Sequence, residues 1–379
     1  MLTKLFVECC VLIQKFMKLP ILDHLKALAT YQPGRPIEEV ARELNIPFND
    51  VIKLASNENP LGPSPKAIKA MQDAVPSVHL YPDGNVFYLK NKMANHLDIS
   101  PESLVFGNGS NELIEWIGHV LLRENSNIVV SQYCFAIYPI IAAMFGAQTK
   151  TVSANHYGHD LNAMAEAVDQ RTRVVFVANP NNPTGTLASK GAVTDFLARI
   201  PDDVLIVMDE AYFEYLPDPT DLLPLIRSGK KPNLLLMRTF SKIYGLSGLR
   251  IGYGVGSPEL IQRMEKVRQP FNVNAIAQAG ALAALDDQEH VDKTRLNNAE
   301  GVEFFQKAFV QMGLEHVPSY ANFVLVKVGD GKQVFDYLQK NGVITRPMAG
   351  YQLPEWLRSS VGLAKENQRC LDVLKLALG

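Results

Sequence analysis

Three short apolar runs in the middle of the chain limit its fold more than any other feature. Val174–Val177, Val204–Met208 and Leu234–Met237 consist of apolar residues, and each ends just before a polar cluster. Helix-like stretches separate the three runs. Strands that alternate with helices form parallel sheets, because a parallel pair needs a long crossover connection. The pattern therefore predicts an α/β fold in which helices flank a mostly parallel central sheet.

The polar clusters after these runs mark the expected position of a site. They span residues 178–186, 209–215 and 238–250. Ligands of such sheets bind beyond the carboxyl ends of the strands. We therefore expect the side chains that carry chemistry to come from these three segments.

The character of the chain changes after about residue 271. Ala275–Leu285 and Val302–Met312 favour helices, and Phe323–Val328 and Leu357–Val361 favour strands. This mixture predicts a smaller α+β unit. We divide the chain into an extension (1–18), an N-terminal arm or part of the small unit (19–50), a large unit (51–275) and a small C-terminal unit (276–379).

Composition and charge exclude several classes of partner. The formal net charge is −2, so there is no basic excess that would favour nucleic acid. The apolar patch Leu5–Ile13 is shorter than the roughly 20 residues of a membrane helix. We interpret it as part of an extension, or alternatively as a peripheral helix that packs on a partner chain. The four cysteines lack the paired spacing of a metal site, so we expect no metal and a reducing cytoplasm.

Lys242 lies in the segment TFSKIYGLSGLR (239–250), directly after the last apolar run. Most lysines are solvated surface residues. A lysine at the end of a strand can instead form a Schiff base with a carbonyl cofactor. Ser241 and Arg250 in the same segment could bind a phosphate group.

The segment DEAYFEY (209–215) follows the middle apolar run. An acid at the end of a strand is often a metal ligand or half of a salt bridge. Beside a pyridine cofactor, the Asp209 carboxylate would keep the ring nitrogen protonated. Tyr212 could form a hydrogen bond to the 3′ oxygen of such a ring.

Asn182 lies in the segment NPNNPTG (179–185) and could form a hydrogen bond to the same oxygen. The Asn, Pro and Gly residues of this segment also form plain turns.

A fourth segment resembles a phosphate cradle. GNGSNE (107–112) follows the apolar run Leu104–Phe106 and precedes the helical stretch Glu112–Leu122. Backbone amides at a helix N-terminus bind phosphate, and the Ser110 hydroxyl would be a further donor.

Arg346 and Arg358 lie in the small unit, where they are either surface charges or a clamp for a carboxylate.

In this order, GNGSNE, NPNNPTG, DEAYFEY, TFSKIYGLSGLR and LRSSVG (357–362) resemble the fold-type-I pyridoxal-phosphate aminotransferases. Four further segments resemble one branch of them, the histidinol-phosphate aminotransferases: YQPG (31–34), LASNENPLG (54–62), YPD (81–83) and GVITR (342–346). The resemblance runs from about Leu19 to the C-terminus. It implies pyridoxal 5′-phosphate as the cofactor, bound by the large unit.

The resemblance also implies roles for individual residues. Lys242 is the Schiff-base lysine and moves the proton, while Asp209 pairs with the pyridine nitrogen and Tyr212 assists. The other residues expected to contact the cofactor are Asn182, Gly109, Ser110, Asn111, Phe135, Thr239, Ser241, Arg250 and, from the neighbouring subunit of a homodimer, Tyr81. The residues expected to bind substrate are Tyr31, Asn57, Arg346 and Arg358. Phe135 is favoured over Tyr133 as the residue that stacks on the ring, because Tyr138 then fits the family's spacing.

The activity implied is amino transfer between L-histidinol phosphate and 2-oxoglutarate in histidine biosynthesis, giving 3-(imidazol-4-yl)-2-oxopropyl phosphate and L-glutamate. The segment Met348–Glu355 resembles a variant branch of the family, which leaves aromatic amino-acid transamination as an alternative. A decarboxylase of a phosphorylated amino acid and a non-catalytic binding protein on the same fold are further alternatives.

Overall fold

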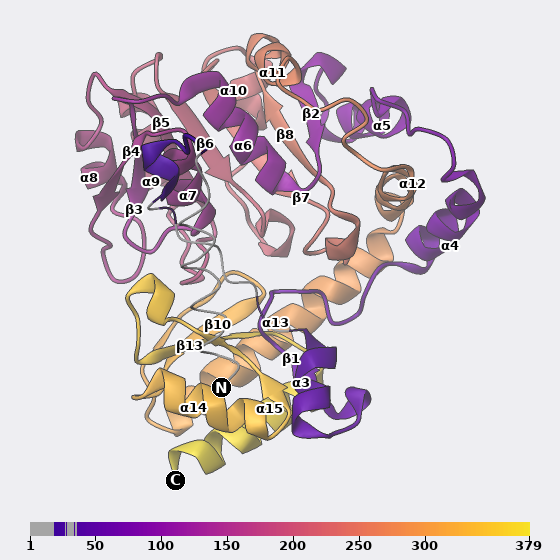
Figure 1. The fold of residues 1–379 in the computed structure, drawn as a ribbon, viewed down its shortest axis with the longest axis vertical. Coiled ribbons are helices and arrows are strands. Elements are labelled where there is room, and N and C mark those ends of the chain that lie inside the picture. The colour runs from indigo at the N-terminus through magenta and orange to yellow at the C-terminus, as the bar shows by residue number, and fades with distance from the viewer. Residues whose placement is uncertain (1–18, 27, 29–33, 35) are drawn as a thin grey trace.

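The computed structural model describes residues 19–26, 28, 34 and 36–379. Figure 1 shows a larger part above, with a seven-stranded sheet between helices, and a smaller part below around a four-stranded sheet. The long helix α13 (Gln288–Gln311) runs from one part into the other. The predicted extension at 1–18 and the substrate residue Tyr31 lie outside the described residues.

The seven-stranded sheet is mostly parallel, as predicted. Its order is β2-β8-β7-β6-β5-β3-β4, and only β8 runs antiparallel to its neighbours. The strands are β2 (Leu104–Gly107), β3 (Asn127–Ser131), β4 (Gln148–Val152), β5 (Thr172–Ala178), β6 (Leu205–Asp209), β7 (Leu234–Thr239) and β8 (Gly252–Gly256). The three apolar runs of the sequence became β5, β6 and β7, which are adjacent in the sheet.

These three strands are apolar throughout because helices cover both faces of the sheet. Successive side chains of a strand point to opposite faces. Val175 and Val177 of β5 therefore enter one core, while Val174 and Phe176 enter the other.

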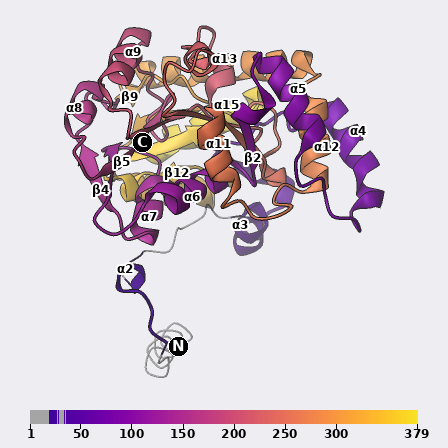
Figure 2. The same ribbon diagram turned by 90° about the horizontal axis from the view of Figure 1, so that it is seen from above.

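Two sets of helices cover these cores. The first core is covered by α5 (Phe87–Leu97), α8 (Leu161–Glu166), α9 (Lys190–Arg199), α10 (Leu223–Arg227) and α12 (Ala275–Ala284). The second is covered by α6 (Ser110–Leu121), α7 (Ile137–Met144) and α11 (Pro258–Glu265). Helix α4 (Pro65–Ala74) packs on α12, and the short α2 (Asp23–Lys26) lies beside α7. Figure 2 shows α4, α5 and α12 together at one end of the molecule.

The smaller part is an antiparallel sheet covered by helices. Its order is β12 (Arg346–Pro347), β13 (Trp356–Ser360), β10 (Phe323–Lys327) and β9 (His316–Val317). Helices α13, α14 (Gly331–Lys340) and α15 (Ala364–Leu378) pack against it. The helix predicted at Val302–Met312 is only the second half of α13, whose polar first half did not stand out in the sequence.

The segment from α3 to β1 joins the smaller part. Strand β1 (Ile52–Lys53) pairs in parallel with β11 (Val343–Ile344), and α3 (Ile37–Leu44) packs nearby. The remaining elements are the 3-10 turns η1 (Phe48–Asp50), η2 (Val75–Ser77), η3 (Pro101–Ser103), η4 (Phe213–Tyr215), η5 (Ser247–Leu249) and η6 (Ala349–Tyr351). The domain boundaries after residues 50 and 275 stay predictions.

Candidate active site

The Lys242 amine lies just beyond β7, on the side where the two parts of the molecule meet. Its Nζ donates to the backbone oxygens of Asn57, at 3.2 Å, and Ser56, at 3.4 Å. Burial, with the nearby positive charge of Arg358, lowers the pKa of Lys242 to about 8. Near neutral pH a larger share of this amine is therefore uncharged than of an ordinary lysine. An uncharged amine is a nucleophile and a base.

Asp209 ends the neighbouring strand β6 and presents a buried carboxylate. Its Oδ2 accepts a hydrogen bond from the Tyr138 hydroxyl at 2.7 Å, and its Oδ1 accepts from the backbone N–H of Ala211 at 3.2 Å. Burial raises the pKa of Asp209, against the effect of these two donors. A buried acid of this kind suits a cationic partner such as a protonated ring nitrogen.

Tyr138 contacts the candidate site residue Asp209, and the sequence assigned it no role of its own. It lies on α7, its ring stacks on Phe176 with centroids 4.4 Å apart, and Phe135 meets its edge at 5.7 Å. In the sequence, Tyr138 served only to favour Phe135 over Tyr133 through the family's spacing. The available signal was its position three residues after Phe135, which itself precedes α7. Tyr133, the alternative to Phe135, instead stacks against Tyr157.

Asn57 connects Tyr212 to the smaller part of the molecule. Its Nδ2 donates to the Tyr212 hydroxyl at 2.9 Å, and its Oδ1 accepts from the Ser360 hydroxyl at 3.0 Å. Its backbone N–H donates to the same Ser360 oxygen at 2.8 Å. Substrate binding by Asn57 stays a prediction, and these bonds place its side chain beside Tyr212.

The two predicted substrate arginines are neighbours across a pair of strands. Arg346 of β12 and Arg358 of β13 are directly opposite in the antiparallel register, so both side chains lie on one face. Arg358 donates to Asn182 Oδ1 at 2.6 Å and to the Ala55 carbonyl at 2.9 Å. A Cβ added to Gly34, in the predicted YQPG turn, would lie 3.5 Å from Arg346 Nη1. The face therefore carries two positive charges beside Asn182.

Close backbone packing shapes the predicted phosphate cradle. Gly109 precedes α6 with a φ of 78°, and a Cβ there would lie 2.5 Å from Arg250 Nη2. A Cβ on Gly252 would lie 2.4 Å from the backbone nitrogen of Ser110, the first residue of α6. These glycines let the helix N-terminus and the guanidinium approach one another, which suits an anion.

The remaining predicted cofactor residues take separate positions. Asn111 is exposed in the first turn of α6. Thr239, the last residue of β7, and Ser241 are both buried, and the Thr239 hydroxyl accepts from the Ser241 N–H at 3.0 Å. Tyr81 lies on the surface with 83% of its area exposed and stacks on Phe271 at 4.8 Å.

The donors and acceptors at this site fit pyridoxal phosphate. A buried amine with a lowered pKa, a buried carboxylate on the next strand and a glycine-lined helix N-terminus beside an arginine meet the needs of its aldehyde, ring nitrogen and phosphate. In the described part of the chain, no group of three or more His, Cys, Asp or Glu side chains could hold a metal ion.

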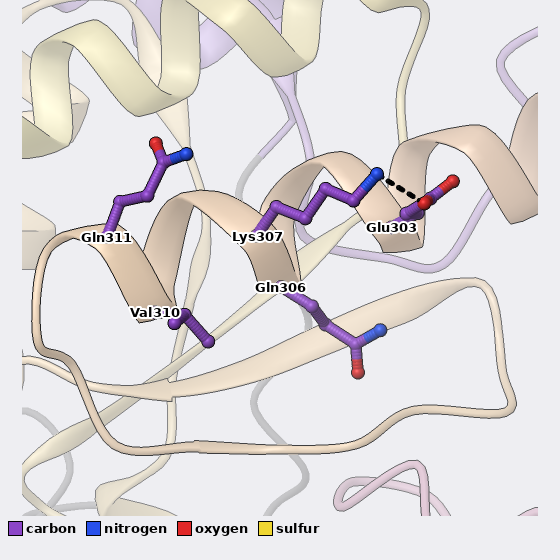
Figure 3. A pocket seen from close by; sticks show the side chains of 5 residues that line it. All are labelled: Glu303, Gln306, Lys307, Val310 and Gln311. Carbon is purple, nitrogen blue, oxygen red and sulfur yellow. Dashed lines mark ion pairs between the residues drawn. The ribbon is translucent and has the colours of Figure 1, made fainter.

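A surface hollow on α13 contains no comparable chemistry. Figure 3 shows its lining side chains, with Lys307 paired to Glu303 along the helix: Glu303, Gln306, Lys307, Val310 and Gln311. An ion pair between exposed side chains four residues apart is common on helix surfaces. We assign this hollow no role.

Comparison with known proteins agrees with the geometry. The family model for aminotransferase class I and II matches residues 49–374. A histidinol-phosphate aminotransferase of Akkermansia muciniphila is 48% identical over 94% of this chain and 98% of its own length. One from Methylobacillus flagellatus is 47% identical over 94% and 96%.

A solved structure supports the same relationship. The histidinol-phosphate aminotransferase of Sinorhizobium meliloti, in complex with pyridoxal-5′-phosphate, superposes with a TM-score of 0.87 at 28% identity. The alignment covers 96% of this chain and 99% of that one. This protein therefore belongs to the class I and II aminotransferases, within the histidinol-phosphate aminotransferase family.

Proposed function

We propose that this protein is a pyridoxal-phosphate-dependent histidinol-phosphate aminotransferase. It transfers an amino group between L-histidinol phosphate and 2-oxoglutarate, giving 3-(imidazol-4-yl)-2-oxopropyl phosphate and L-glutamate, a reversible step of histidine biosynthesis. The observation that carries the proposal is the sequence identity of 48% and 47%, over 94% of this chain, to two relatives of that name. Asp209 ends β6, and Lys242 follows the adjacent strand β7 by three residues, which supports the chemistry.

The proposed roles follow from the contacts of each side chain. When bound, pyridoxal phosphate supplies an electron-withdrawing ring that stabilises negative charge on the substrate's Cα. Lys242 attaches the cofactor and moves the Cα proton, and the Ser56 and Asn57 carbonyls hold its amine when it is free. Asp209 keeps a proton on the ring nitrogen.

The two arginines explain how one site accepts two different substrates. Histidinol phosphate carries a phosphate and no carboxylate, whereas glutamate carries two carboxylates. Guanidinium groups bind both kinds of anion through paired N–H donors. Arg346 and Arg358, side by side on β12 and β13, would therefore bind each substrate in turn.

The substrate is tested by comparing two amino donors in separate reactions. Purified enzyme with 2-oxoglutarate receives either histidinol phosphate or phenylalanine, and glutamate formation is followed. We expect histidinol phosphate to be the strongly preferred donor. A clear preference for phenylalanine would contradict the proposal and favour aromatic transamination.

The role of Lys242 is tested by Lys242→Ala. We expect this variant to lose nearly all amino transfer and the absorbance of lysine-bound cofactor, because no other amine replaces it. Lys230→Ala, at an exposed position, is the matched control. Full activity in Lys242→Ala would refute the assignment.

We also propose a homodimer in which Tyr81 reaches the neighbouring subunit's cofactor phosphate. Tyr81 is exposed together with Leu80, Phe87, Tyr88 and Phe271, an apolar group that another chain could cover. Mixing Lys242→Ala with Tyr81→Ala subunits tests this. Hybrid dimers would contain one intact site and recover activity, whereas a Tyr81 that serves its own subunit would give no recovery.

The location of the protein in the cytoplasm stays a prediction. Among the described helices, none is long and apolar enough to cross a membrane.

A further inference from the structure

A buried ion pair lies directly beside the candidate site. Arg238 Nε donates to Glu210 Oε2 at 2.8 Å, and each side chain is only 4% exposed. Glu210 follows Asp209 at the end of β6, and Arg238 precedes Thr239 at the end of β7. The pair therefore links the two strand ends that carry the proposed cofactor residues.

The pair faces away from the cofactor residues. Successive strand residues point to opposite faces, so Arg238 and Thr239 project to opposite sides of the sheet. The Arg238 guanidinium lies 3.5 Å from the ring centroid of Phe213, the residue after Tyr212. One guanidinium thus holds the turn that carries Asp209 and Tyr212 at two points, through a carboxylate and through a ring.

Stability alone does not account for this cluster. Burying two charges costs about as much as their attraction returns, so apolar residues of similar size stabilise a fold as well or better. Two buried polar atoms, Arg238 Nη2 and Glu214 Oε2, also have no hydrogen-bond partner among the described residues. Groups like these are retained where they set geometry.

We propose that Arg238 is a positioning residue of the cofactor site. By binding Glu210 and stacking on Phe213, it sets the turn after β6 against the turn after β7. The spacing between the Asp209 carboxylate and the Lys242 amine depends on that alignment. The proposal rests on the proposed function, because it assumes that these two groups hold pyridoxal phosphate.

The test removes both charges at once, so that neither is left buried alone. In the double variant Arg238→Met/Glu210→Met, two apolar side chains replace the pair, which preserves folding in comparable cases. We would measure the unfolding temperature without cofactor, the dissociation constant of pyridoxal phosphate by fluorescence titration, and the circular dichroism of the bound cofactor. We expect the unfolding temperature to be nearly kept, the affinity to fall by about tenfold or more, and the dichroism to change.

A matched control joins the same two strands at their other ends. Lys231 Nζ lies 3.2 Å from Asp202 Oδ1, just before β7 and β6 begin. The variant Lys231→Met/Asp202→Met loses an ion pair at the amino edge of the sheet, far from the proposed site. We expect its cofactor affinity and dichroism to equal those of the wild type.

A conservative single variant covers the case in which the double variant does not fold. Arg238→Lys keeps the charge but loses the planar fork that serves Glu210 and Phe213 together. We expect weaker binding and altered dichroism here as well. Wild-type affinity and dichroism in either folded variant would overturn the positioning role, while a wild-type protein that binds no pyridoxal phosphate would instead refute the proposed function.

Discussion

Tyr138→Phe isolates one hydrogen bond to the proposed acid of the site. The substitution removes the hydroxyl that donates to Asp209 Oδ2 at 2.7 Å. It leaves the ring stacked on Phe176 at 4.4 Å, so packing is conserved. Among the described residues, the Asp209 carboxylate then keeps the hydrogen bond from the Ala211 backbone N–H, at 3.2 Å, as its only one.

The size of the effect follows from the charge of the acceptor. A hydrogen bond to a charged group contributes about 1.5–3 kcal/mol, which corresponds to about 10- to 150-fold in an equilibrium constant. Loss of this donor raises the pKa of Asp209 further, because burial already favours its neutral form. A neutral acid binds a protonated ring nitrogen less well, so cofactor affinity and amino transfer should both fall.

The assay is a titration of the cofactor-free protein with pyridoxal phosphate at several pH values. We expect the variant to bind at least about tenfold more weakly, with the deficit growing as the pH falls and Asp209 becomes protonated. Tyr157→Phe is the matched control, since it removes a tyrosine hydroxyl from the Glu315 carboxylate at 3.1 Å. Equal affinity of wild type and Tyr138→Phe across the pH range would refute the reasoning.

Two further substitutions test the phosphate cradle and the half-buried acid Glu214 next to Arg238. Gly252→Ala places a Cβ 2.4 Å from the Ser110 nitrogen, so α6 must shift. We expect the affinity for pyridoxal phosphate to fall and the free energy of unfolding to drop by about 1–3 kcal/mol. Gly248→Ala has open space around its Cβ and should behave as wild type in the same titration and unfolding measurements. Burial raises the pKa of Glu214 from 4.5 to about 7, although Arg238 opposes the shift. The folded protein thus holds a proton that the unfolded chain releases, and stability falls by on the order of 3 kcal/mol as the pH rises through that window. Glu214→Gln should lose this share of the pH dependence of the unfolding free energy. If the stability of wild type and variant changed with pH in the same way, the raised pKa of Glu214 would be contradicted.

The three central strands β5, β6 and β7 could be predicted from the sequence. Apolar runs followed at once by polar residues predicted β5, β6 and β7, and their polar ends predicted Asn182, Asp209 and Lys242 as site residues. The strands could be predicted because strands buried on both faces are apolar along their whole length, so that the change to polar residues marks where the strand leaves the core. The roles of Asn182, Asp209 and Lys242 stay predictions.

The partners of these residues could not be read in the same way. Tyr138 lies 71 residues before Asp209, Asn57 lies 155 before Tyr212, and Asn182 lies 176 before Arg358. Tyr138 sits in an apolar helix, where an aromatic residue ordinarily signals core. Arg238 stands inside an apolar strand without any local sign of the carboxylate it binds.

Local residue patterns therefore sufficed for the central strands, the family and the candidate chemical groups of this protein, because these depend on neighbours along the chain. Other features depend on how distant elements pack. They are the hydrogen bonds to Asp209 and Tyr212, the facing pair Arg346 and Arg358, and the ion pair of Arg238 with Glu210. Sheet register and helix packing set distances to fractions of an ångström, and no spacing along the chain encodes them.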